Sequence, residues 1–140
     1  MCLSREYPKE PLPGVLAAVV RNGKVLLVLR AKDPDKDKWG LPGGMMEAGE
    51  TPVQAARREL FEETHVQAIG GQVIDQFEIR SEGGRFHYHL SVVKLEWQAG
   101  DGMAGSDAAQ VGWFTFDDIL ELSCSQKLLR IAKLLLTNKA

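Results

Sequence analysis

Short apolar runs rich in β-branched residues stand near the start of the chain and predict paired strands. Two of them, at residues 15–21 and 24–30, are separated by Asn22-Gly23. This dipeptide favours a two-residue hairpin turn, because both of its residues readily adopt positive φ. The pattern therefore predicts an antiparallel hairpin. Three prolines within residues 1–13 disfavour a helix ahead of it, so we expect an extended N-terminal arm there.

The next strong signal marks the beginning of a helix at Pro52. Thr51 is suited to cap the helix, proline is favoured at the first helical position, and Gln54 can complete a capping box with Thr51. We expect this helix to continue to about Thr64. Its apolar residues then fall on one stripe, at about 100° per residue, which is typical of a helix packed on a core. The stripe consists of Val53, Ala56 and Leu60.

The second half of the chain alternates strand and helix patterns without an internal repeat. The elements expected there are strands at 72–80 and 86–97 joined by a turn at Gly83-Gly84, a loop over 98–110, a strand at 111–116, a short helix from Asp117 and a final helix over 125–136. A loop as long as 98–110 within a compact domain is more often functional than not. The order of elements indicates one α/β domain over residues 14–140.

The composition agrees with a single globular domain. The 140 residues are 44% hydrophobic and 26% charged, with a formal net charge of −2, so we expect no duplex nucleic acid as a partner. The longest apolar run, 15–20, is too short to cross a bilayer, and the N-terminus lacks the apolar segment of a secretory signal. We therefore expect a cytoplasmic protein without membrane association. Cys2 and Cys124 match no metal-binding spacing, and we expect two free thiols.

The predicted helix at 52–64 carries the candidate chemistry. Glu59, Glu62 and Glu63 are related by three and four residues, so they share one arc on the solvent side of the helix, away from its apolar stripe. Their mutual repulsion is offset in part by Arg58, four residues before Glu62, and more fully by a hard divalent cation such as Mg²⁺ or Mn²⁺. Taken alone, the helix is more typical of a solvated acidic face than of a metal site.

The segment before the helix changes that interpretation. Residues 39–44 read Trp-Gly-Leu-Pro-Gly-Gly, a glycine-rich turn that lets the backbone approach a ligand. The turn and the acidic helix together resemble the Nudix hydrolase family, whose box is G-x5-E-x7-R-E-U-x-E-E-x-G-U with U a bulky aliphatic residue. The chain matches eight of these nine positions: Gly44, Glu50, Arg58, Glu59, Leu60, Glu62, Glu63 and Val66. The resemblance covers about residues 14–135 and implies a mixed β-sheet sandwiched between helices.

One position of the box departs from the family pattern, because His65 stands where the family has glycine. A glycine there commonly ends the helix in the left-handed conformation. Histidine can adopt the same conformation at a cost of about 1 kcal/mol relative to glycine. We therefore expect a slightly strained helix end at His65 rather than an inactive site.

The resemblance also implies the roles of individual residues. It implies a Mg²⁺ or Mn²⁺ site formed by Glu59, Glu62, Glu63 and a backbone carbonyl of Gly43 or Gly44. Arg58 is expected to pair with a carboxylate and fix its rotamer, and Glu50 to orient Arg58 or the loop rather than bind metal. The general base would be Glu59, Glu62 or Asp107, the last of these in the predicted loop. A turn aspartate is an equally good interpretation of Asp107.

Substrate contacts are expected from two further places. Arg30 ends the second predicted strand and is a candidate for binding a phosphate. Residues 86–89 alternate on a strand, with Phe86 and Tyr88 on one face and His87 and His89 on the other. Phe86 and His87 are therefore the candidates for contact with a base or ribose, and an ordinary core strand is the alternative.

The resemblance implies hydrolysis of a diphosphate bond in a nucleoside diphosphate linked to a second group. The small size and the loop pattern are most like ADP-ribose pyrophosphatases, which would release AMP and ribose 5-phosphate. Two alternatives stay open: a nucleoside triphosphate pyrophosphohydrolase that cleans the nucleotide pool, and a non-catalytic module that binds ADP-ribose. The expected partner is a nucleotide-type small molecule. Many relatives are dimers, which leaves a homodimer open.

Overall fold

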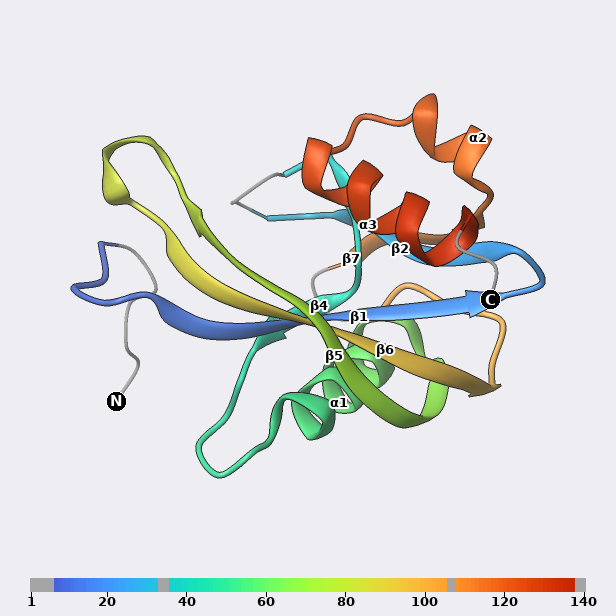
Figure 1. Ribbon diagram of the computed structural model, residues 1–140, viewed down its shortest axis with the longest axis horizontal. Coiled ribbons are helices and arrows are strands. Elements are labelled where there is room, and N and C mark those ends of the chain that lie inside the picture. Colours follow the sequence, from blue (N-terminus) through green and yellow to red (C-terminus); the bar gives the residue numbers. More distant parts are fainter. Residues whose placement is uncertain (1–6, 33–35, 106–107, 138–140) are drawn as a thin grey trace.

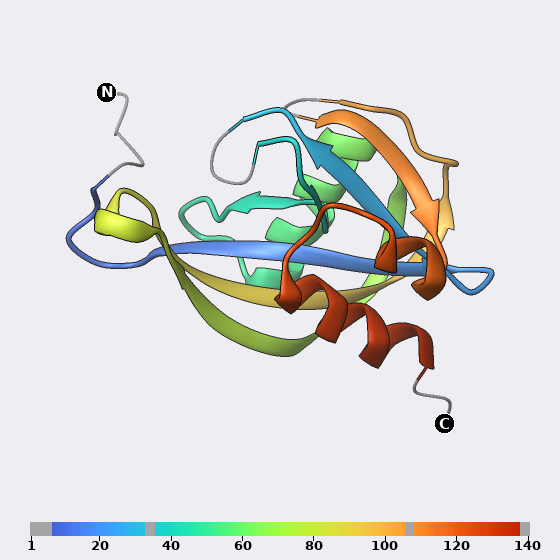
Figure 2. The same cartoon turned by 90° about the horizontal axis from the view of Figure 1, so that it is seen from above.

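The computed structural model describes residues 7–32, 36–105 and 108–137 as a mixed β-sheet with helices on both sides (Figure 1). The strands are β1 (Leu12–Arg21), β2 (Lys24–Arg30), β3 (Trp39–Gly40), β4 (Gly43–Met45), β5 (Gln67–Arg80), β6 (His87–Ala99) and β7 (Ala108–Phe114). The helices are α1 (Pro52–Thr64), α2 (Phe116–Leu120) and α3 (Gln126–Thr137), with a 3₁₀ turn, η1 (Glu82–Gly84). Figure 2, in which the molecule is seen from above, shows α3 lying along the sheet. The predicted fold class, a mixed sheet between helices, is confirmed.

Strand β1 organises the sheet, whose main path runs β3-β2-β1-β6-β5. β1 pairs in parallel with β6 along most of its length. On its other side it changes partner: residues 14–16 pair with β4, whereas Val20 and Arg21 pair with β2. The sheet therefore opens between β4 and the β2–β3 region, and this opening places the site described below.

The core consists of two apolar layers, one on each face of the sheet. On β1, Val15, Ala17 and Val19 contact the layer under α1, while Ala18 contacts the layer under α2 and α3. This alternation follows from the two-residue period of a strand. Because both faces are covered, β1 and β2 read as continuous apolar runs rather than as alternating ones.

The local signals of the first half are confirmed. Asn22 and Gly23 have φ of 53° and 75° and form the hairpin turn between β1 and β2. Helix α1 begins at Pro52, and both hydrogen bonds of the capping box between Thr51 and Gln54 are present. The helix ends at Thr64, as expected.

Several predicted boundaries were wrong. The first strand begins at Leu12, inside the predicted arm. β5 begins at Gln67 instead of residue 72, because Gly70 and Gly71, with φ of 68° and 143°, form an irregularity that the strand passes through. β7 begins at Ala108, inside the predicted loop, and ends at Phe114 because Thr115 caps α2. Among the helices of the described residues, none combines the length and the apolar composition that a membrane span requires.

Candidate active site

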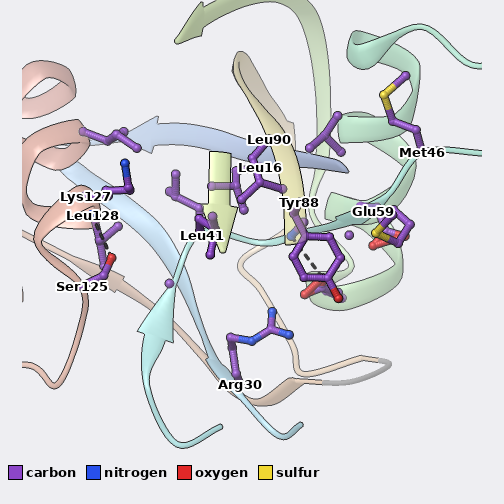
Figure 3. Close-up of a pocket in the computed structure, with 18 of the residues that line it drawn as sticks. Leu16, Arg30, Leu41, Met46, Glu59, Tyr88, Leu90, Ser125, Lys127 and Leu128 are labelled. Atoms are coloured by element: carbon purple, nitrogen blue, oxygen red, sulfur yellow. Dashed lines mark hydrogen bonds between the residues drawn. The ribbon is translucent and has the colours of Figure 1, made fainter. Parts of the chain in front are cut away.

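A cavity of about 500 Å³ lies at the opening of the sheet and joins elements from both layers. One side is formed by β4 and α1, the opposite side by the beginning of α3, and apolar residues of β1, β5 and β6 lie between them. Figure 3 shows Glu59 on one side, Ser125 and Lys127 on the other, and Tyr88 between them. The cavity is therefore acidic at one end and largely apolar toward the other.

The acidic end depends on two glycines of β4. A methyl group on Gly44 would overlap the Glu59 carboxylate, and one on Gly43 would overlap the backbone oxygen of Val15. Glycine at both positions lets α1 approach β4 from one side while β1 pairs with it from the other. The sequence predicted that a ligand could approach the backbone of this turn closely. In the structure the Glu59 carboxylate makes such an approach, and Gly43 and Gly44 also line the cavity.

Glu59 is a partly desolvated carboxylate of the site. Its side chain is 14% exposed, and it accepts a hydrogen bond of 2.7 Å from Arg58. Burial raises the pKa of the Glu59 carboxyl, although the hydrogen bond and the charge of Arg58 act in the opposite direction. A carboxylate whose charge is incompletely compensated is favourably placed to bind a cation.

Glu63 corrects the prediction that the acidic arc lies on the solvent side. The residue is only 5% exposed, and its Oε2 accepts a hydrogen bond of 3.1 Å from the backbone N–H of Gly43. At about 100° per residue Glu63 lies about 20° from Ala56 around α1, at the edge of the core stripe, and β4 covers that side of the helix. Glu62, whose side chain is 46% exposed, is the member of the arc that reaches solvent.

Arg58 holds the acidic end together. Its Nε and Nη2 donate to the two carboxylate oxygens of Glu50 at 2.7 and 2.9 Å, and Nη2 also donates to the carbonyl of Met45. Nη1 donates to Glu59 at 2.7 Å and to Glu62 at 3.1 Å. Arg58 thus contacts three carboxylates, and Glu50 contacts both Arg58 and, through the N–H of Glu47, the loop before α1. These hydrogen bonds lower the pKa of Glu50 and raise that of Arg58.

The end of α1 is held by the segment 100–105. His65 has φ 59° and ψ 16°, so the predicted left-handed helix end is confirmed. The N–H groups of Met103 and Gly105 donate to the carbonyls of Thr64 and Glu63 at 2.8 and 2.7 Å, which satisfies two groups of the last helical turn. Asp107, the candidate general base of this loop, lies outside the described residues.

Arg30 lines the cavity, but the structure differs from the prediction at residues 86 and 87. Tyr88 lines the cavity, whereas Phe86 is buried and stacks on Tyr88 with ring centroids 6.2 Å apart. His87 lies against Glu78 at 3.1 Å and is not among the residues that line the cavity. The alternation of the strand did identify the face shared by Phe86 and Tyr88.

Among the cavity residues that were not anticipated are an aromatic ring and a lysine that contact each other. Phe77 on β5 and Lys127 on α3 both line the cavity, and the Lys127 ammonium lies 4.4 Å from the centroid of the Phe77 ring. They are 50 positions apart in the sequence, and no local motif links them. Only the packing of α3 on the sheet brings them together.

The donor set at the acidic end fits a hard divalent cation in its chemistry. Carboxylates and backbone carbonyls are the ligands that Mg²⁺ and Mn²⁺ prefer. Arg58 donates hydrogen bonds to both Glu59 and Glu62, and the N–H of Gly43 in β4 donates one to Glu63. Over residues 7–32, 36–105 and 108–137, however, no three acidic, imidazole or thiol side chains are grouped closely enough to form a metal site.

Comparison with known proteins agrees with this geometry. A model of the NUDIX domain matches residues 10–134, so the chain belongs to the Nudix family and is a Nudix hydrolase, a class that generally uses divalent metal ions. An ADP-ribose pyrophosphatase of Methanocaldococcus jannaschii is 29% identical over 113 residues, which cover 81% of this chain and 67% of that protein.

Two further similarities show the breadth of the family. The human diphosphoinositol polyphosphate phosphohydrolase 3-alpha is 32% identical over 110 residues, which cover 73% of this chain and 61% of that protein. A solved structure, the MutT Nudix hydrolase of Burkholderia pseudomallei, matches with a TM-score of 0.79 at 28% identity and covers 89% of this chain and 96% of its own. All three relatives carry the names of hydrolases, and two of the names refer to different compounds, ADP-ribose and diphosphoinositol polyphosphate.

Proposed function

We propose that this Nudix hydrolase cuts the diphosphate bond of a nucleoside diphosphate linked to a second group, in a reaction that depends on Mg²⁺ or Mn²⁺. ADP-ribose, which would give AMP and ribose 5-phosphate, is the substrate we propose first. The observation that carries the proposal is the cavity itself, because it joins a cluster of carboxylates at one end to an aromatic and apolar surface at the other. The name of the Methanocaldococcus jannaschii relative supports the choice of ADP-ribose.

At the acidic end, Glu59, Glu62 and Glu63 with a carbonyl of Gly43 or Gly44 would hold the cation. A divalent cation there supplies charge neutralisation on the phosphoryl oxygens and a lowered pKa for a bound water. Arg58 keeps the carboxylates of Glu59 and Glu62 on one side of the cavity through its hydrogen bonds. The proton of the attacking water passes to a carboxylate, for which Glu59, Glu62 and Asp107 are the candidates.

Between the acidic end and α3, Tyr88 and Phe77 provide aromatic surface for a nucleobase. Phe86 contributes indirectly, since it stacks on Tyr88 from outside the cavity. Arg30 points into the cavity in Figure 3 and is our candidate for binding a phosphate oxygen. Lys127 lies where it can donate a hydrogen bond to the group bound beside Phe77.

The test is a panel of ADP-ribose, NADH, dinucleoside polyphosphates, nucleoside triphosphates and a diphosphoinositol compound, each assayed for phosphate release with Mg²⁺ or Mn²⁺ and a coupled phosphatase. We expect ADP-ribose to be cut fastest, with the signal lost on adding a chelator. The Glu63→Gln variant should lose turnover by orders of magnitude, and Glu78→Gln, on the outer side of β5, serves as its control.

The outcomes separate the substrate from the mechanism. A preference for triphosphates or for the diphosphoinositol compound overturns ADP-ribose and keeps the metal-dependent reaction. Full activity in the presence of chelator, or in Glu63→Gln, overturns the metal assignment. Tight binding of ADP-ribose with no product under saturating metal would indicate a binding module instead.

A further inference from the structure

The histidine that replaces the box glycine makes a contact that glycine cannot make. Nδ1 of His65 lies 3.2 Å from the carbonyl oxygen of Met103. Because a carbonyl only accepts hydrogen bonds, this contact requires the proton on Nδ1. The ring also meets Phe61, one turn earlier on α1, edge to face with centroids 5.8 Å apart. The ring is thus held between α1 and the segment 100–105.

The same segment is tied to the turn of α1 that carries the carboxylates. Met103 is joined to the helix end twice, since its N–H donates to Thr64 and its carbonyl faces His65. Gly105 donates to the carbonyl of Glu63, and a methyl group at position 105 would overlap the backbone oxygen of Glu62. The segment therefore lies directly against the backbone of both Glu62 and Glu63.

The other side of the segment is fixed to the sheet. The indole N–H groups of Trp97 and Trp113 donate to the carbonyls of Gly100 and Asp101 at 2.7 and 2.6 Å. Arg21 pairs with the Asp101 carboxylate at 2.8 Å and lies over the ring of Trp97. The segment 100–105 thus connects the sheet to the last turn of α1 by hydrogen bonds on both of its sides.

We infer that His65 is a positioning residue: its side chain holds the segment 100–105 against the end of α1 and so fixes Glu62 and Glu63 for the hydrolytic reaction. Position 65 is left-handed, where glycine would relieve strain. A strained backbone conformation at a non-glycine residue is explained when the side chain makes a contact that glycine lacks, as His65 does with Met103. The inference rests on the proposed function only for its effect on turnover.

Three variants test the inference. His65→Gly keeps the left-handed conformation and removes the donor. His65→Asn tolerates the same conformation and carries an amide nitrogen one bond from Cγ, as Nδ1 is, so it should restore the hydrogen bond. Asn22→Gly is the matched control, because it replaces another left-handed residue, φ 53°, in the hairpin between β1 and β2.

The primary measurement is hydrogen exchange at the amides of Met103 and Gly105, which needs no substrate. One exposed hydrogen bond changes the open population by about fivefold, so in His65→Gly both amides should exchange about fivefold faster. The kcat should fall by a similar factor while KM is unchanged, because the other end of the cavity is untouched. His65→Asn and Asn22→Gly should match the unmodified protein in exchange and in kcat.

Each contrary result overturns a stated part of the inference. Unchanged exchange in His65→Gly shows that the side chain does not hold the segment. Faster exchange with unchanged kcat shows that the segment does not position the carboxylates. Equal loss in His65→Gly and His65→Asn assigns the effect to the ring and not to the hydrogen bond. If ADP-ribose proves not to be the substrate, the exchange result still stands, and kcat is then measured on the compound that is cut.

Discussion

Replacing Gly44 by alanine should abolish most of the activity and leave the fold nearly unchanged. A methyl group at position 44 would lie 2.5 Å from the carboxyl carbon of Glu59, about 0.9 Å inside the 3.4 Å at which ordinary contact begins. The Glu59 carboxylate must therefore move by about 1 Å. A displacement of this size at a reacting centre costs about 100-fold in rate, and we expect kcat to fall by that factor.

Replacing the neighbouring residue, Gly43, by alanine should chiefly lower the stability of the fold, whereas the Gly44 substitution chiefly lowers activity. A methyl group on Gly43 would meet backbone atoms of β1, namely the Val15 carbonyl oxygen and, at 3.0 Å, the Leu16 Cα. Backbone cannot rotate aside as a carboxylate can, so Gly43→Ala should lower the free energy of unfolding by about 2–4 kcal/mol. Gly44→Ala should change it by less than about 1 kcal/mol.

The assay is steady-state hydrolysis with saturating metal, combined with urea unfolding of each variant. Gly40→Ala is the control, since a methyl group there would meet no atom within 4 Å, and its kcat should stay within about twofold of the unmodified enzyme. A Gly44→Ala enzyme with normal kcat would refute the argument that the approach of Glu59 to β4 sets the geometry of the site.

Three further predictions concern charges of the cavity. Burial raises the pKa of Glu59, so the folded state binds this proton more tightly than the unfolded chain does. The associated stability is present at low pH and is lost as the pH rises through the folded pKa. Glu59→Gln should therefore be inactive yet more resistant to thermal unfolding at pH 7, with a smaller advantage near about pH 4. Arg58 lowers the pKa of Glu50, so Glu50→Gln should lose about 1–2 kcal/mol at pH 7 in urea unfolding, and this deficit should shrink on acidification. Lys127→Met should raise KM by about fivefold with kcat unchanged in the same hydrolysis assay, since Lys127 lines the far end of the cavity; a fall in kcat would contradict its placement there.

Local signals predicted the elements that carry the carboxylates. The capping box at Thr51 and Gln54, the box spacing and the left-handed position at His65 depend on residues within a few turns of one another, and each is present in the structure. The beginning of β5 was missed for a physical reason. Gly70 and Gly71 read as a break, but the irregular pairing with β6 carries the strand through them.

The far end of the cavity could not be predicted from local patterns. Phe77 and Lys127 come from β5 and α3, and their contact depends on how the helix packs across the sheet. The burial of Glu63 was missed because this residue, seven positions after Ala56, lies at the edge of the apolar stripe rather than opposite it, and because β4 covers that side of the helix. Register and layer packing decide both features.

The change of partner along β1 explains why the two ends of the cavity belong to opposite layers. Helices α1 and α3 cover different faces of the sheet, so their side chains would ordinarily be separated by it. Because residues 14–16 of β1 pair with β4 and its last residues pair with β2, the sheet opens, and Glu59 and Lys127 reach one cavity. The carboxylates are then fixed by α1, β4 and the segment 100–105, whereas the opposite end is formed by α3, with β5 and β6 between the two. Substitutions on α3 should therefore change which substrates bind without altering the geometry at the carboxylates, which is the arrangement expected of a family whose members share one reaction and act on different compounds.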